Sequence, residues 1–387
     1  MRIDRRRFLC AGGAAAVTAW ISGVARAQGS RASYDRLLIL VELKGGNDGL
    51  NTVVPYVEPA YARLRPRLAV PRDQVLQLDQ RSGLHPSLEP LMASWRNQEL
   101  AIVQSVGYPG ANLSHFRSID IWDTASGSSE YLTEGWLARA FAAAPAPASF
   151  AADAVVVGGA EMGPLRGGVR AIALANPEQF LRQARYAAPA GQARNAALHH
   201  ILRVEENIAQ AAARLTGSRT FATEFPAHPF GNAARIASQL VAGEAGVAAV
   251  KIALGGFDTH SGQPGRHAQL LKAFAEGTAA LKNALIEIGR WDTTLVMTYS
   301  EFGRRPRENL SSGTDHGTAS AHFLLGGRVK GGLYGEPPAL SRLDGNGNLP
   351  FAVDFRDLYA TVLERWWGVE STRPLKGRFS ALDVIRA

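Results

Sequence analysis

Four segments of this sequence carry side chains that could hold a metal ion or attack an ester. Each follows an apolar run, and they span Lys44–Gly49, Asn112–His115, Gly255–His260 and Ser300–Arg304. In an open parallel sheet the loops that follow the strands lie along one edge, where ligands bind. We therefore expect these distant segments to converge on one site, and that convergence indicates an enzyme.

The first of these segments places Asp48 after the apolar run Leu37–Leu43. Gly45 and Gly46 allow the backbone to turn sharply, so that the carboxylate can reach the sheet edge. The G-x-G-x-x-G spacing of dinucleotide-binding loops is absent. Two interpretations of Asp48 remain, a ligand to a cation at the end of the first strand or the cap of a tight turn.

Ser114 follows the second apolar run, Ala101–Val106, and begins a helix. Its hydroxyl is either a helix N-cap or a nucleophile supported by the positive end of the helix dipole. Arg117 stands where a reciprocal capping box would need Glu or Gln. We do not expect the neighbouring His115 to act as the base of a serine triad. Because no G-x-S-x-G motif surrounds Ser114, a metal-free serine hydrolase is disfavoured.

The remaining segments combine acidic and histidine side chains. Five of the nine histidines fall in or beside them, at positions 115, 260, 267, 316 and 322. This clustering favours a metal site over isolated surface histidines. Oxygen and imidazole ligands together suit zinc, manganese or iron better than magnesium or calcium. The candidate metal ligands in these segments are Asp258, His260, Glu301, Asp315, His316 and His322.

The first 27 residues predict export. Asp4–Leu9 contains a paired-arginine motif, a charge-free stretch follows from Phe8 to Ala25, and Ala25–Ala27 supplies a small-x-small cleavage site. These features are typical of a twin-arginine signal, so we expect the export machinery of that route as a partner. Gly, Ala, Ser and Thr dominate the stretch, which argues against a stable membrane span in the mature protein. The expected location is periplasmic or extracellular; a plain secretory signal and an uncleaved anchor are the alternatives.

The charge of the chain limits its partners. The net charge of +8 falls to +4 when the signal is removed, because five arginines and one aspartate leave with it. A remainder of 37 basic and 33 acidic residues does not support nucleic-acid binding through a strong basic field. The one cysteine, Cys10, lies within the signal. The mature chain therefore has neither disulfides nor thiolate metal ligands.

The elements that must position these residues alternate between strands and helices. Near-continuous apolar strands between helices predict an α/β fold, a doubly wound and mostly parallel sheet with helices on both faces. We expect residues 28–387 to form a single domain. Apolar, β-branched runs predict strands at Arg36–Leu43, Leu100–Val106, Ala154–Val157, Val247–Leu254 and Thr293–Tyr299. Helical periodicity predicts helices at Ala193–Leu215, His267–Ile288 and Phe355–Trp367.

Five motifs carry a resemblance to a known family. They are Leu-Lys-Gly-Gly-Asn-Asp-Gly-Leu-Asn at 43–51, Ser-His-Phe at 114–116, Gly-Gly-Phe-Asp-Thr-His at 255–260, Tyr-Ser-Glu-Phe-Gly-Arg-Arg at 299–305 and Gly-Thr-Asp-His-Gly at 313–317. With the arginine signal, this set resembles the exported bacterial family called domain of unknown function 1501. That family is similar in turn to the alkaline-phosphatase and sulfatase superfamily, whose members hold two metals over a Ser or Thr nucleophile on a doubly wound sheet.

The resemblance implies roles for individual residues. Asp48 would be the first-strand metal ligand and Ser114 the nucleophile, while the other ligands come from later loops. The superfamily expects a histidine four residues after its aspartate, where this chain has Gly262. Either Glu301 or Asp315 could occupy the remaining acidic position. The implied ligands are Asp315 with His316 for one metal, and Asp258 with His260 and His322 for the other.

The resemblance also implies a chemistry, the hydrolysis of phosphate or sulfate esters with one or two divalent metals, zinc or manganese. The expected substrate is a small anionic or carbohydrate-linked ester, bound in part by Arg304 or by the neighbouring basic residues Lys44, Arg305 and Arg307. The alternative is a catalytically degenerate relative that binds metal and serves as an envelope binding or assembly protein.

Overall fold

The computed structural model describes residues 32–174, 219–243 and 246–386. The predicted export signal and the predicted helix at 193–215 lie outside these residues. The described residues from Ala32 onward form one compact unit. Within the described residues, no helix is long and apolar enough to cross a membrane.

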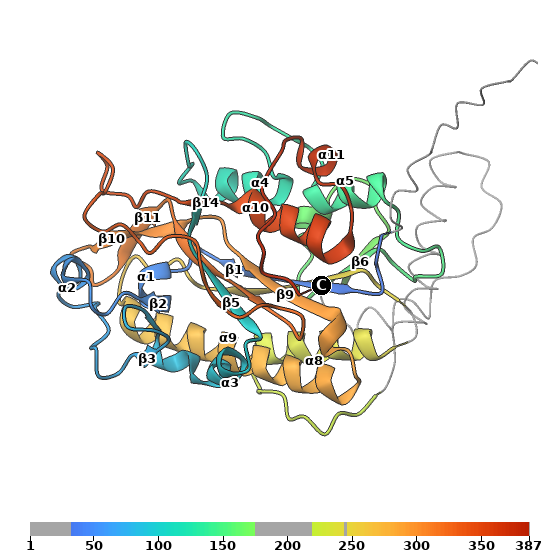
Figure 1. The fold of residues 1–387 in the computed structure, drawn as a ribbon, viewed down its shortest axis with the longest axis horizontal. Helices are drawn as coiled ribbons and strands as arrows, with labels where there is room; N and C mark the ends of the chain where they lie inside the picture. The colour runs from blue at the N-terminus through green and yellow to red at the C-terminus, as the bar shows by residue number, and fades with distance from the viewer. Residues whose placement is uncertain (1–31, 175–218, 244–245, 387) are drawn as a thin grey trace, which may run out of the picture. The chain divides into compact units, whose positions relative to one another are not determined.

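A nine-stranded sheet forms the centre of the unit (Figure 1). Its central strand, β1 (Leu37–Lys44), pairs in parallel with β8 (Ala249–Gly255) on one side and β9 (Thr294–Tyr299) on the other. The strand order is β13-β5-β12-β9-β1-β8-β6-β7, and β14 pairs with β5. Only β12 (Ser320–Leu325) runs antiparallel to its neighbours in this sheet. The carboxyl ends of β1, β8 and β9 therefore meet at one edge.

The sheet forms because its central strands are apolar on both faces. All six residues of β9 and the first seven of β1 are buried, which matches strands covered by helices on both sides. Two large apolar clusters flank the sheet, one on each face. Alternate residues of β1 divide between them, with Ile39 and Val41 in one cluster and Leu38 and Leu40 in the other.

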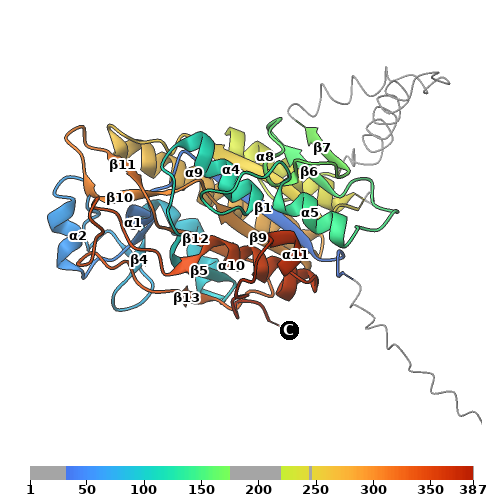
Figure 2. The same cartoon turned by 90° about the horizontal axis from the view of Figure 1, so that it is seen from above.

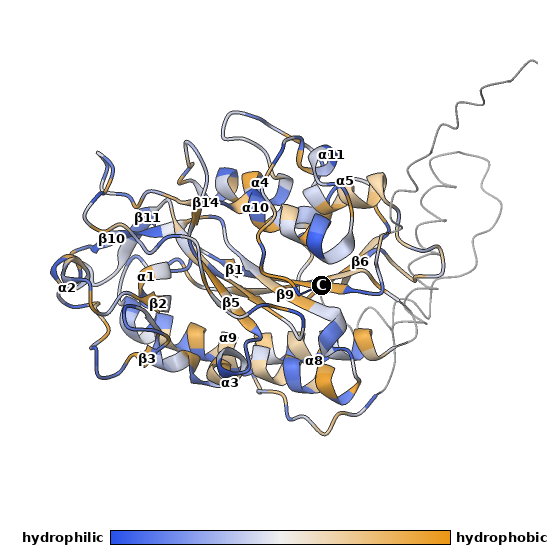
Figure 3. Ribbon diagram, viewed as in Figure 1, coloured by the Kyte–Doolittle hydropathy of each residue, from blue (hydrophilic) through white to orange (hydrophobic). Residues whose placement is uncertain are grey.

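Helices cover both faces of the sheet (Figures 1 and 2). On one face lie α4 (His115–Thr124), α5 (Trp136–Ala143) and α10 (Phe355–Ala360). On the other lie α8 (Pro229–Ala242) and the long α9 (Gln263–Glu287). The buried residues of α8 and α9 are mostly apolar, and hydrophilic residues occupy other positions along the same helices (Figure 3).

Further strands and helices complete the unit. The strands are β2 (Val53–Val54), β3 (Leu76–Gln77), β4 (Gly83–Leu84), β5 (Leu100–Gly107), β6 (Ala154–Val157), β7 (Ala171–Leu174), β10 (Gly303–Glu308), β11 (Thr314–Gly317), β13 (Gly332–Tyr334) and β14 (Val353–Asp354). The helices are α1 (Gly49–Thr52), α2 (Pro59–Leu64), α3 (Met92–Arg96) and α11 (Thr372–Leu375), with 3-10 turns η1 (Pro86–Leu91), η2 (Gly163–Leu165) and η3 (Trp291–Thr293) and a π-helical turn η4 (Thr361–Trp367).

The predicted fold class is confirmed, because the sheet is mostly parallel and helices cover both of its faces. All five predicted strands are present, with bounds that differ by at most two residues. The predicted C-terminal helix is also present, and Trp366 and Trp367 donate their indole N–H groups to the backbone of Leu37 and Arg36. The antiparallel strand β12 was not predicted, because its polar start at Ser320 and buried His322 hide the apolar pattern of a strand.

Candidate metal centre

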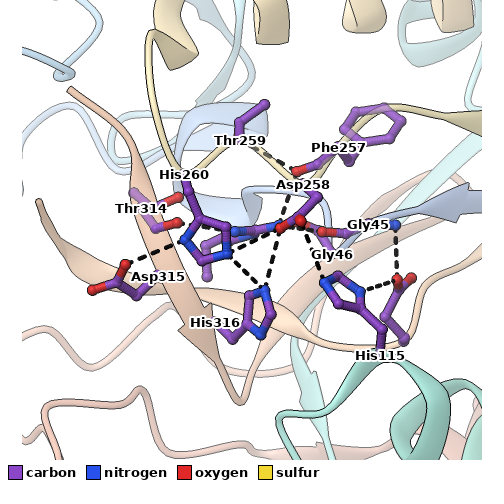
Figure 4. Close-up of polar contacts among 12 residues, drawn as sticks. Gly45, Gly46, His115, Phe257, Asp258, Thr259, His260, Thr314, Asp315 and His316 are labelled. Atoms are coloured by element: carbon purple, nitrogen blue, oxygen red, sulfur yellow. Dashed lines mark hydrogen bonds and ion pairs between the residues drawn. The ribbon is translucent and has the colours of Figure 1, made fainter. Parts of the chain in front are cut away.

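Three histidines surround the carboxylate of Asp258 at the edge where the central strands end (Figure 4). Asp258 and His260 lie in the loop between β8 and α9, His316 lies on β11, and His115 begins α4. Asp258 Oδ1 is 3.1 Å from His260 Nε2 and 3.2 Å from His316 Nε2. Its other oxygen, Oδ2, is 3.4 Å from His115 Nε2. Three separate segments thus direct one nitrogen each toward one carboxylate.

The opposite side of two of these rings is fixed by hydrogen-bond acceptors. His316 Nδ1 donates to the backbone carbonyl of Leu113 at 2.7 Å. His115 Nδ1 lies 2.9 Å from Oε1 of Glu301, whose side chain is only 7% exposed. Because carbonyl and carboxylate oxygens only accept, each ring carries its proton on Nδ1. The Nε2 of each ring faces Asp258. A protonated Nε2 donates to that carboxylate, and a deprotonated Nε2 offers its lone pair to a cation.

His260 completes the arrangement with the same orientation. Its Nδ1 lies 3.3 Å from Oδ1 of Asp315, and its Nε2 lies 2.9 Å from His316 Nε2. Burial lowers the pKa of His316, which favours its neutral form. Two neutral imidazoles with lone pairs facing each other at this distance repel, unless a proton or a cation lies between them. A cation bound between the two rings would remove this repulsion, as would a proton carried on one Nε2.

The chemistry of these donors selects the kind of cation. His115, Asp258 and His316 each offer one ligand atom, and the three atoms all lie within 4.8 Å of one another. In the part of the chain that the structure describes, this is the only group that brings three such atoms together. Two imidazoles and a carboxylate fit zinc, or a similar transition metal, better than magnesium or calcium. A site with three protein ligands leaves a coordination position for water or substrate.

Arg304 keeps the central carboxylate ionised. Partial burial favours the protonated form, but Arg304 and His316 outweigh it and lower the pKa of Asp258 to about 2. The Arg304 guanidinium lies 2.7 Å from Asp258 Oδ1, and its side chain has no exposed area. It also donates to the carbonyls of Gly46 at 2.8 Å and Thr314 at 2.9 Å. The expectation that Arg304 binds the substrate anion is not supported, because its donors face buried loops.

Ser114 is exposed and directly precedes His115 in the chain. It is the N-cap of α4, but its hydroxyl makes no capping hydrogen bond. The residues on either side of it both contact the site, Leu113 through its carbonyl to His316 and His115 through its ring. Ser114 is thus an exposed residue flanked in the chain by two residues that contact the group, at the positive end of a ten-residue helix.

The structure does not bring Asp48 into the group. Asp48 is fully buried, and its Oδ2 forms an ion pair with Arg65 at 2.6 Å, in which neither side chain is exposed. Its Oδ1 accepts the N–H of Leu50 at the start of α1, and Gln263 donates to its Oδ2. Burial alone would raise the pKa of Asp48, but Arg65 lowers it. Arg65 thus supplies the positive charge that the sequence interpretation assigned to a metal.

His322 is also placed elsewhere. It lies on β12 inside the sheet layer, where its ring centroid is 5.2 Å from that of Trp122. Burial lowers the pKa of His322 to about 3. Its Nδ1 is 3.5 Å from the hydroxyl of Thr298. These surroundings are those of a neutral core histidine.

The carboxylates of Glu301 and Asp315 contact histidines of the group. Each carboxylate contacts the Nδ1 of a histidine, His115 for Glu301 and His260 for Asp315. Such partners orient metal-binding imidazoles and raise their basicity. His115 is the ligand that sequence reasoning missed. Its place among the clustered histidines, beside the candidate nucleophile, was the signal that could have identified it.

Residues 68–377 match the family described as "Protein of unknown function (DUF1501)". No curated protein matches the chain.

Several solved structures show a distant likeness. One, described as a protein in the alkaline phosphatase superfamily from Vibrio parahaemolyticus, is 10% identical with a TM-score of 0.42, over 89% of this chain and 69% of that one. The lipoteichoic acid synthase LtaP from Listeria monocytogenes is 10% identical with a TM-score of 0.37, over 90% and 76%. The C-terminal periplasmic domain of EcEptC from Escherichia coli is 12% identical with a TM-score of 0.39, over 88% and 86%.

Proposed function

This chain belongs to the DUF1501 family, and from its site we propose that it is an exported, metal-dependent hydrolase of phosphate or sulfate esters. One observation carries the proposal. The imidazoles of His115, His260 and His316 direct their Nε2 atoms at Asp258, and the exposed Ser114 directly precedes His115 at the N-terminus of α4. A cation-binding group next to an uncommitted hydroxyl at a helix N-terminus suits attack on an anionic ester.

His115, Asp258 and His316 would hold the metal, zinc or manganese, with His260 beside them. When bound, the metal would neutralise the ester oxygens and favour the ionised form of the serine hydroxyl. Glu301 holds the ring of His115, and the carbonyl of Leu113 holds that of His316. Neither ring must therefore reorient when the metal binds.

The serine then acts as the nucleophile. Ser114 Oγ forms a bond to the phosphorus or sulfur atom while the bond from that atom to the leaving alcohol breaks. The hydroxyl proton leaves the serine and the departing alkoxide takes up a proton, so an alcohol and a seryl ester result. Water then cleaves the seryl ester, which releases phosphate or sulfate and restores the hydroxyl. The N-terminal backbone amides of α4 support the anionic oxygens throughout.

The proposal includes export, based on the paired arginines and the charge-free stretch of residues 1–27. Substitution of the paired arginines by lysine should leave unprocessed precursor in the cytoplasm, as detected by fractionation. A processed product that still reaches the periplasm in normal amounts would favour a plain secretory signal.

A second candidate is a metal-binding relative without catalytic activity. The observation that favours it is the placement of Asp48 and His322 away from the metal-binding group, which leaves one cation site among the residues described here. Such a protein would bind zinc and hydrolyse no ester.

The two candidates are separated by a variant of the nucleophile. We expect Ser114→Ala to lower turnover of aryl phosphate or aryl sulfate esters by about three orders of magnitude or more, with zinc binding unchanged. Ser129→Ala, an exposed serine in the loop after α4, is the control and should retain full activity. Acid quenching during turnover should trap the phosphoryl or sulfuryl group on the peptide containing Ser114. Full activity of Ser114→Ala on every ester tested would exclude this nucleophile.

A further inference from the structure

The substrate of such an enzyme carries a negative charge, and the structure limits which basic side chain can bind it. Arg304 is fully buried, and its donors face Asp258 and loop carbonyls. Lys251 is also buried, and it is held by Glu42 at 2.8 Å and by the carbonyl of Glu161 at 3.1 Å. Neither group can turn to a ligand without breaking several buried contacts.

Lys44, at the end of β1, remains accessible. Its side chain is 40% exposed and contacts Glu161 Oε2 at 2.5 Å. The Glu161 side chain is itself 72% exposed. An ion pair between two exposed side chains contributes little to stability and is screened by solvent. A multiply charged anion can therefore displace Glu161 from Lys44 without disturbing the fold.

The backbone of Lys44 is joined to the loops of the metal-binding group. Its carbonyl accepts the N–H of Phe257, the residue before Asp258, at 3.0 Å. The next residue, Gly45, donates its N–H to Oε1 of Glu301 at 2.8 Å. That same oxygen contacts the ring of His115 (Figure 4). Lys44 thus lies between the two loops that position Asp258 and His115.

The side chain also leaves the sheet on the appropriate face. Successive residues of a strand point to opposite faces, so Lys44 shares a face with Leu38 and Leu40. Those two leucines pack in the cluster that contains Trp122 of α4. His115 is the first residue of the same helix. Lys44 therefore projects toward the side of the sheet on which α4 presents Ser114 and His115.

We propose that Lys44 binds the tetrahedral anionic group of the substrate, and that Glu161 holds the ammonium group when no anion is bound. This inference rests on the proposed function and assigns the charge recognition that Arg304 cannot perform. A tetrahedral oxyanion, phosphate or sulfate, is the ligand chemistry. The exchange of one carboxylate partner for the anion makes Glu161 a competitor of the substrate.

Binding of inorganic phosphate and inorganic sulfate to the zinc-loaded protein tests the inference by calorimetry. Lys44→Ala should weaken binding of the preferred anion by about 10-fold or more, because a charge-assisted contact is lost. Glu161→Gln should strengthen it by about 2-fold to 5-fold, since the competing carboxylate is removed. Zinc stoichiometry should be unchanged in both variants. Lys272→Ala, which removes an exposed lysine paired with Glu276 on α9, is the matched control and should bind like the wild type.

Wild-type affinity in Lys44→Ala, weaker binding in Glu161→Gln, or no binding of either anion to the wild-type protein would overturn the inference. The outcome is separable from that of the proposed catalysis. A protein that hydrolyses no ester, but binds phosphate in a manner that depends on Lys44, would retain the anion site and lose the enzymatic function. Ester hydrolysis with an unchanged KM in Lys44→Ala would retain the enzymatic function and exclude Lys44 as the anion-binding residue.

Discussion

The carboxylate of Glu301 should control how tightly the metal binds, although it contacts the proposed ligand His115 and not the metal itself. Its Oε1 accepts from Gly45 N at 2.8 Å and contacts His115 Nδ1 at 2.9 Å, and the side chain is 7% exposed. Glu301→Gln keeps an acceptor oxygen in this position and removes the charge. Partners of this kind contribute about 10-fold to 100-fold to metal affinity. The expected loss of zinc affinity corresponds to about 1.4–2.7 kcal/mol.

Asp315 provides the matched comparison. It contacts the Nδ1 of His260 as Glu301 contacts that of His115, but at 3.3 Å and with a side chain that is 51% exposed. Because solvent screens this pair, we expect Asp315→Asn to weaken zinc binding by about 3-fold or less. Competition with a chromophoric zinc chelator at pH 7 measures both losses. Equal losses in the two variants, or unchanged affinity in Glu301→Gln, would refute the argument that the buried contact fixes the ring of His115.

Two further predictions concern buried charges away from the metal-binding group. Burial raises the pKa of Asp123 to about 8 against its ordinary value of 3.8, and Lys251 only partly opposes this. The protonated carboxyl of Asp123 therefore stabilises the fold fully below the ordinary pKa, and this contribution is lost as the pH rises toward 8. The free energy of unfolding falls by up to about 1.4 kcal/mol per pH unit over that range. The free energy of unfolding, measured in urea from pH 5 to 8, should fall less steeply with pH in Asp123→Asn than in the wild type. An equal fall in both proteins would contradict the raised pKa of Asp123. Arg65→Met should destabilise the fold by about 3–5 kcal/mol, because it leaves Asp48 buried without its partner. The double variant with Asp48→Asn should recover part of this loss in urea unfolding, and Asp48→Asn alone should keep the full zinc stoichiometry. A zinc site lost in Asp48→Asn would restore the first-strand ligand that the sequence interpretation proposed.

The sequence was sufficient to predict the strands that carry the site. β1 and β9 are apolar along nearly their whole length, and this pattern has few alternatives to a buried parallel strand. The loops that follow such strands share one edge, so the loops that carry Asp258 and Glu301 are expected on the same side of the sheet, where both residues contact His115.

The partners of individual side chains were not predictable in the same way. Asp48 pairs with Arg65, which lies just after α2, and no local pattern identifies that contact. His322 follows the expected motifs in sequence, but the pairing of β12 between β5 and β9 places it inside the sheet layer. His115 was set aside as a triad base because it adjoins Ser114. Only the direction in which α4 begins shows that its ring faces Asp258.

We expect one divalent metal to bind between the histidines and Asp258. Diffraction from crystals of the zinc-loaded protein, recorded on both sides of the zinc absorption edge, tests it most directly. The expected result is an anomalous peak about 2.0–2.2 Å from Nε2 of His115, Nε2 of His316 and a carboxylate oxygen of Asp258. A peak at Asp48 or His322, or no peak among these three residues at full zinc loading, would contradict the claim.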